Sequence, residues 1–135
     1  MFFAGPARLQ MRTHTALSSP AWFYRFAQVP PTQLGKTFGA THAAEIPYVF
    51  GELTPTPNSP WSDADRQVSD LVMSYWTQFA ATGNPNRAGL PTWPPFDKAN
   101  DAYLTLAATP KSGTGLHRDA ALFDRFESQR RAKSN

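Results

Sequence analysis

The alternation of apolar and polar positions predicts one long amphipathic helix over residues 62–82. Its apolar residues recur at the i, i+3, i+4 and i+7 spacing that places them on one face; they are Val68, Leu71, Val72, Tyr75, Trp76, Phe79 and Ala80. Ser62 precedes the pattern as an N-cap, with Asp65 three residues later in a variant of the capping box. Gly83 follows at the position where a left-handed residue ends many helices. An apolar stripe of this width needs another surface to cover it.

Weaker patterns predict two further helices and two strands. Residues 5–17 form a helix with Pro6 in its first turn, and residues 117–131 form a last helix. Residues 21–29, rich in aromatic side chains, and residues 102–107 are predicted strands, with connections rich in Pro, Gly and Asn between the elements. Two strands make no stable sheet in water by themselves. We therefore expect an α/β chain with about three helices and two or more strands of a larger sheet.

Composition indicates a packed chain and argues against several classes of partner. The 135 residues include ten Phe, four Trp and four Tyr, more than a disordered chain carries. The net charge of +3 is thinly spread, so we expect no nucleic-acid partner. No apolar run reaches the roughly 18 residues that would span a membrane. Cysteine is absent, and the first residues lack the charged start and apolar core of a signal peptide, so the compartment stays unknown.

His42 is the candidate general base. It lies in a predicted loop after an aromatic strand, where a side chain can face a cleft, and Glu45 follows three residues later. Spacing alone also allows a loop histidine bonded to a backbone carbonyl, or a pair of metal ligands. The metal alternative is weak because a catalytic zinc needs three protein ligands, so no metal or other cofactor is expected. His14 and His117 are expected to be surface or capping residues.

Residues 39–51, GATHAAEIPYVFG, resemble the histidine loop of the carboxylesterase/cholinesterase family, the type-B carboxylesterases. The agreement extends over nearly the whole chain. It includes the PAR run at 6–8, the aromatic strand at 22–26, and the YWTQFA and TGNPN runs at 75–80 and 82–86. The likeness is of the bacterial para-nitrobenzyl-esterase type. It implies that residues 1–135 are an incomplete, C-terminal part of a carboxylesterase type-B domain, a C-terminal fragment of an α/β-hydrolase fold.

The resemblance also implies serine-esterase chemistry. His42 would be the histidine of the catalytic triad, and Glu45 a supporting glutamate beside the site but not the triad acid. In this fold the chain order is serine, acid, histidine, which places the serine elbow, oxyanion hole and acid before residue 1. No G-x-S-x-G occurs in the sequence, and Ser112, in PKSGT, lacks the first glycine and follows His42. A small-molecule ester would be the substrate only of a complete enzyme, and this chain alone is predicted to be inactive.

Two functions remain open from the sequence. The first is a segment of a serine carboxylic-ester hydrolase, arising from a truncated or split gene or a mis-called start. The second is a non-catalytic, cholinesterase-like remnant acting as an interaction module. In either case the apolar stripe predicts self-association through exposed apolar surface. The proline-rich run PTWPPF at 91–96 could be a peptide ligand, but such a run more often packs an edge loop.

Overall fold

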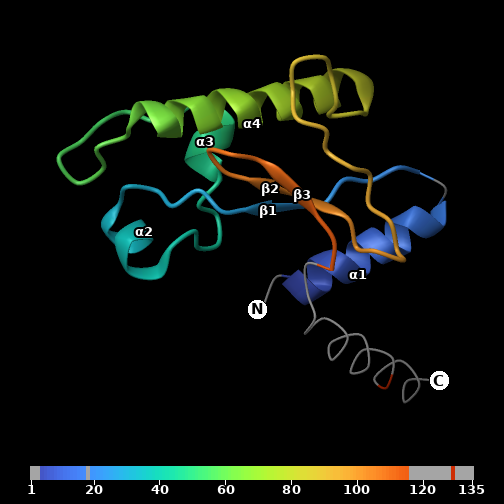
Figure 1. The fold of residues 1–135 in the computed structure, drawn as a ribbon. Helices are drawn as coiled ribbons and strands as arrows, with labels where there is room; N and C mark the ends of the chain where they lie inside the picture. The colour runs from blue at the N-terminus through green and yellow to red at the C-terminus, as the bar shows by residue number, and fades with distance from the viewer. Residues whose placement is uncertain (1–3, 18, 116–128, 130–135) are drawn as a thin grey trace. The chain divides into compact units, whose positions relative to one another are not determined.

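The structure, a computed structural model, describes residues 4–17, 19–115 and 129. Figure 1 shows the helices and strands as a ribbon. The chain divides into two compact units. The first unit consists of residues 1–23, 94–103 and 113–135. The second consists of residues 24–93 and 104–112, and it contains the candidate residues His42 and Glu45.

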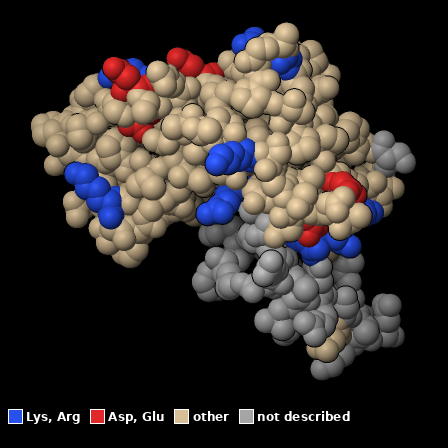
Figure 2. Space-filling view, viewed as in Figure 1, with Lys and Arg blue, Asp and Glu red and all other residues tan. Residues whose placement is uncertain are grey.

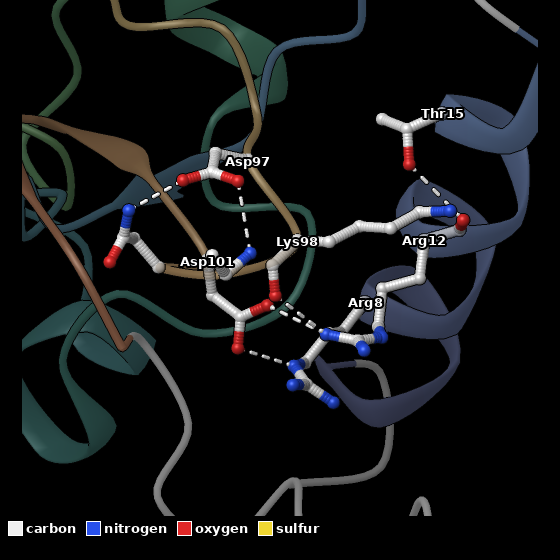
Figure 3. A network of polar contacts seen from close by, with 8 residues as sticks. Arg8, Arg12, Thr15, Asp97, Lys98 and Asp101 are labelled. Atoms are coloured by element: carbon white, nitrogen blue, oxygen red, sulfur yellow. Dashed lines mark hydrogen bonds and ion pairs between the residues drawn. The ribbon is translucent and has the colours of Figure 1, made fainter.

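A buried ion pair anchors the helix of the first unit, α1 (Ala4–His14), as Figure 3 shows. Arg8 is only 9% exposed, and its Nε donates to Oδ2 of Asp101 at 2.6 Å. Arg12 donates to the backbone carbonyl of Lys98 at 3.0 Å and, more weakly, to Asp101 at 3.5 Å. Asp101 has a left-handed φ of 47°, which Asp adopts more readily than most residues. The pair therefore fixes α1 against the turn at residues 97–101.

Removing the charge of Asp101 is predicted to destabilise the chain. The Asp101→Asn variant keeps a side chain that tolerates the left-handed backbone but removes the carboxylate that accepts hydrogen bonds from Arg8 and Arg12. We expect a loss of about 2–4 kcal/mol of unfolding free energy, measured by urea denaturation. Lys98→Ala is the matched control, because only the backbone of Lys98 takes part; an equal loss in both variants would contradict the assignment.

The predicted long helix is confirmed in the second unit as α4 (Asp63–Thr82). Ser62 caps it: its Oγ accepts from the backbone N–H of Asp65 at 3.2 Å, while its own N–H donates to Oδ2 of Asp65 at 3.0 Å. Gly83 ends the helix with a left-handed φ of 72°. The apolar stripe is only partly covered, because Val68, Val72 and Tyr75 are at most 1% exposed whereas Phe79 is 49% exposed.

The sheet has three strands in the order β1 (Tyr24–Phe26), β2 (Tyr103–Leu106) and β3 (Lys111–Gly113). β1 and β2 are parallel, with Tyr24 opposite Leu104 and Phe26 opposite Leu106. The predicted strand at 21–29 is thus too long. It pairs with β2 only over three residues, because β2 itself ends at Leu106, opposite Phe26. Parallel strands occur almost only in sheets covered on both faces, as expected for part of a larger sheet.

Three short elements were not predicted: α2 (Gln33–Phe38), α3 (Ile46–Phe50) and β3. The connection that follows the predicted strand at 21–29 contains α2, because Thr32 caps this helix by accepting from the N–H of Gly35 at 3.0 Å. Pro47 lies in the first turn of α3, where proline is tolerated, and the helix ends after five residues. The predicted helix over 117–131 lies almost entirely outside the described residues.

Asp65 joins three segments of the second unit. It is 4% exposed and accepts four hydrogen bonds: from the Tyr48 hydroxyl at 2.8 Å, the Gln28 amide at 2.9 Å, and the Ser62 Oγ and N–H at 2.7 and 3.0 Å. Burial by itself raises the pKa of this carboxyl, but the hydrogen bonds from Ser62, Tyr48 and Gln28 outweigh it and hold the pKa below its usual 3.8. The ionised carboxylate therefore ties α3 and the segment after β1 to the start of α4.

The Asp65→Asn variant is predicted to lose about 2–3 kcal/mol of unfolding free energy near neutral pH, because an amide cannot satisfy the same set of buried donors. Asp63→Asn is the matched control: the Asp63 side chain is 98% exposed, and its pairing with Arg66 is long at 3.7 Å, so little change is expected. Urea denaturation of both variants measures the difference in unfolding free energy.

The effect of Asp65 on stability should depend on pH. The pKa of its carboxyl is lower in the folded chain than in the unfolded chain, so its stabilising effect is present above the unfolded-state pKa. It is lost as the pH falls through the folded-state pKa. The difference in unfolding free energy between wild type and Asp65→Asn should therefore become smaller at acid pH. A difference that does not change with pH would contradict an ionised Asp65 in the folded chain.

Candidate functional site

His42 is exposed and lies in a turn at residues 42–45, between α2 and α3 of the second unit. It follows β1 as expected, although α2 occupies part of the predicted loop. Before the turn, α2 ends at Gly39, whose N–H donates to the carbonyl of Gly35; at the end of the turn, the N–H of Ile46 donates to the carbonyl of Ala43. Ala43 has a left-handed φ of 65°, a conformation that costs a residue with a Cβ about 1–2 kcal/mol. The neighbouring structure therefore imposes the shape of this turn.

Glu45 is half-buried at the start of α3 and is held at both its backbone and its side chain. Its carbonyl accepts from the N–H groups of Tyr48 and Val49 at 3.0 and 2.9 Å. Its Oε1 accepts a long hydrogen bond, 3.5 Å, from the hydroxyl of Tyr24 on β1. The carboxylate three residues after His42 is thereby connected to the sheet.

Tyr24 is not among the candidate residues predicted from the sequence, and the structure adds it to the site. Its ring makes edge-on contacts with Trp76 and Trp93, with centroids 5.3 and 6.0 Å apart. Burial, and secondarily the charge and hydrogen bond of Glu45, raise the pKa of Tyr24 to about 12. Tyr24 is therefore a neutral hydrogen-bond donor at all ordinary pH values. The one signal for it in the sequence was its place in an aromatic strand.

An open groove of about 520 Å³ lies beside Glu45. Its lining is almost wholly apolar and comes from α3 and α4 together with Tyr24 and Glu45; the helical residues are Ile46, Val49, Phe50, Trp76, Thr77 and Ala80. Among the described residues that line the groove, Glu45 is the only acidic or basic one. The groove can therefore bind an apolar group, with one carboxylate available to accept a hydrogen bond.

The described part of the chain contains no serine elbow at Ser112, no cluster of metal ligands and no membrane-spanning helix. Ser112 lies on β3, where its hydroxyl donates to the carbonyl of Thr92 at 3.4 Å, so it does not occupy a strand-turn-helix elbow. No three potential metal ligands gather among the residues that the structure describes. None of the described helices is long and apolar enough to cross a membrane. On the face seen in Figure 2, acidic and basic side chains of the described residues are interspersed with uncharged surface.

A sequence model described as the Carboxylesterase family matches residues 1–123. The chain belongs to the carboxylesterase family. It is 35% identical to carboxylesterase 1C of Rattus norvegicus over 126 residues, which are 91% of this chain and 22% of that protein. It is also 35% identical to the bile salt-activated lipase of Homo sapiens over 120 residues, 84% of this chain and 16% of that protein.

A solved esterase structure shares the fold of this chain. PNB esterase superposes with a TM-score of 0.64 and is 27% identical in sequence, over 76% of this chain and 21% of that protein. The predicted membership of the type-B carboxylesterases and the predicted α/β-hydrolase fold are confirmed. The chain spans about a fifth of the length of the relatives it matches. It is thus a carboxylesterase-family fragment, matched over only part of a larger fold.

The Tyr24–Glu45 contact predicts a specific titration. Subtracting the absorbance titration of Tyr24→Phe from that of the wild type should isolate a phenol that ionises near pH 12. Glu45→Gln should lower this pKa only in part, because burial is the larger cause. Because the pKa of the Tyr24 hydroxyl is higher in the folded chain than the value of about 10 in the unfolded chain, Tyr24 stabilises the fold fully below pH 10. This stabilisation is lost as the pH rises towards 12. An isolated phenol that titrates at its ordinary value would contradict the arrangement.

Proposed function

We propose that this chain is the C-terminal segment of a serine carboxylic-ester hydrolase and that His42 is the general base of its active site. The observation that carries the proposal is the position of His42. It is an exposed side chain in a turn fixed between α2 and α3, inside the region that matches the carboxylesterase family. Histidine is the side chain that proteins use most often as a general acid and base.

The proposed reaction is acyl transfer through a covalent intermediate. As the serine oxygen adds to the ester carbonyl carbon, its proton passes to the imidazole of His42. The imidazolium then protonates the departing alcohol oxygen, which leaves an acyl-enzyme. Water repeats the sequence on the acyl-enzyme, releases the carboxylic acid and restores the serine. Glu45, fixed by Tyr24 and by the start of α3, would stabilise the loop that carries His42.

The remaining catalytic parts would come from the rest of the domain. The 135 residues contain no G-x-S-x-G, and the chain spans about a fifth of its relatives. The serine, the oxyanion hole and the triad acid are therefore assigned to the portion of a carboxylesterase that this chain does not match. A small-molecule ester is the proposed substrate of the completed enzyme only, and we expect no nucleic-acid partner.

A second candidate function is a non-catalytic interaction module. The open apolar groove between α3 and α4 favours it, since apolar surface of this kind marks binding sites. The two functions differ in one respect: an interaction module does not need His42.

The first test uses the chain alone. Wild type and His42→Ala should hydrolyse a short-chain p-nitrophenyl ester at the same rate, because neither contains a serine elbow. Initial rates at matched protein concentrations measure this. A rate that depends on His42 would mean that a nucleophile lies within the 135 residues, with Ser112 the first residue to replace.

The second test uses a completed domain, in which residues 1–123 replace the matching portion of PNB esterase. His42→Ala should lower kcat by about 10³-fold or more, since general acid–base catalysis contributes on the order of 10²–10⁴. His14→Ala, on α1, is the matched control and should leave kcat unchanged. If the His42→Ala and His14→Ala variants of a folded chimera were equally active, His42 would not be the general base. The interaction module would then be the remaining candidate function.

A further inference from the structure

The TGNPN run of residues 82–86 forms the turn that follows α4, and its own side chains hold it in shape. The Oγ1 of Thr82 accepts from the N–H of Asn84 at 3.2 Å. The Oδ1 of Asn84 accepts from the backbone N–H and from the Nδ2 of Asn86, at 2.9 and 3.1 Å. Pro85, between the two asparagines, is almost wholly buried. The turn therefore holds the side chain of Asn86 in one orientation.

Asn86 makes a pair of hydrogen bonds with the backbone of Trp93. Its Oδ1 accepts from the N–H of Trp93 at 2.7 Å, and its Nδ2 donates to the carbonyl of the same residue at 2.9 Å. The amide side chain thus bonds both backbone groups of one residue, as a residue of a neighbouring strand does. An amide carries a donor and an acceptor side by side, which few other side chains offer. Asn86 therefore fixes the backbone position of Trp93.

The ring of Trp93 packs between α4 and Tyr24. It is 5% exposed, and its centroid lies 5.3 and 5.9 Å from the rings of Tyr75 and Trp76 on α4. It also contacts the ring of Tyr24 edge-on at 6.0 Å. Because side chains in such a cluster are close-packed, the position of one ring limits the position of the next. The backbone of Trp93 thereby influences where the Tyr24 hydroxyl lies.

We propose that Asn86 is a positioning residue of the candidate site, acting through the backbone of Trp93. Trp93 in turn holds the ring of Tyr24 where its hydroxyl reaches Glu45. That hydrogen bond is 3.5 Å long, at the upper limit for such a bond, so a small displacement of the ring breaks it. The inference rests on the proposed function, because Glu45 would stabilise the loop that carries His42. It extends that function to a residue that touches neither the loop nor the substrate.

The first arm of the test titrates Tyr24 in the 135-residue chain. Asn86→Leu keeps a side chain of similar size, adds no charge and removes both hydrogen bonds to Trp93. In each background, subtracting the absorbance titration of Tyr24→Phe isolates the Tyr24 phenol. We expect its pKa to fall from about 12 towards its ordinary value in Asn86→Leu, because burial is the largest cause of the raised pKa. Arg87→Ala is the matched control: this exposed neighbour donates to the Oγ of Ser74 at 3.1 Å, and its loss should leave the Tyr24 titration unchanged.

The second arm measures ester hydrolysis in the chimera of residues 1–123 with PNB esterase. Asn86→Leu should lower kcat by about 10-fold, since a displacement of about 1 Å at a catalytic group can cost on the order of 10²-fold. KM should change less than kcat, because Asn86 does not bind the substrate. In a Tyr24→Phe background the hydrogen bond to Glu45 is already absent, so Asn86→Leu should cause little further loss. An equal loss of kcat in both backgrounds would show that Asn86 does not act through Tyr24 and would overturn the proposal.

Trp93→Phe decides the case if Asn86→Leu does not fold. This variant keeps the backbone groups that Asn86 bonds but places a smaller ring against Tyr24. It should lower both the pKa of Tyr24 and the kcat of the chimera, as Asn86→Leu does.

Three results would overturn the proposal: a folded Asn86→Leu chain in which Tyr24 still titrates near pH 12, a Trp93→Phe variant with unchanged pKa and kcat, or failure of both variants to unfold cooperatively. The proposed catalytic function fails separately. A folded chimera whose activity does not depend on His42 would reject the general base, while the titration in the 135-residue chain still decides whether Asn86 positions Tyr24.

Discussion

The buried carboxylate of Asp65 is the interaction on which the arrangement of the second unit depends. It closes the capping box of α4 and also accepts from Tyr48 of α3 and from Gln28 beyond β1. The capping box itself needs only the hydrogen bonds between Asp65 and Ser62. The hydrogen bonds from Tyr48 and Gln28 also connect two other segments to the start of α4. Because Tyr48 is wholly buried and lies in α3, the junction also fixes the helix that begins immediately after the turn of His42 and Glu45.

This junction explains how an exposed histidine can have a defined place. The turn of His42 has no core of its own, and Ala43 is held there in an unfavourable backbone conformation. Its order comes from α2 before it and α3 after it, and α3 is fixed through Tyr48 and Asp65. The connection of Glu45 to Tyr24 adds a link to β1. Residues far from any chemistry thus determine where the candidate general base lies.

Local signals in the sequence were sufficient for α4, because its period, its N-cap and its terminal glycine all agree. They were sufficient for β2 as well, and the family resemblance identified the fold. The local signals did not predict features that depend on contacts between distant segments. The strand at 21–29 is limited to Tyr24–Phe26 by the three residues of β2 that it can pair with. The cap of α2 at Thr32 was hidden in a proline-rich stretch, and the role of Tyr24 depends on a contact with Glu45, 21 residues away. The catalytic role of His42 stays a prediction.

Chemical rescue tests the central claim most directly, because it separates a proton-transfer role for His42 from a structural one. In the chimera of residues 1–123 with the remaining portion of PNB esterase, His42→Gly removes the imidazole and leaves space where it stood. If His42 is the general base, added imidazole will restore p-nitrophenyl ester hydrolysis in this variant, in proportion to its concentration and above the rate of imidazole in solution. A folded His42→Gly chimera that does not respond to imidazole, or that retains the activity of the parent chimera, would contradict the account.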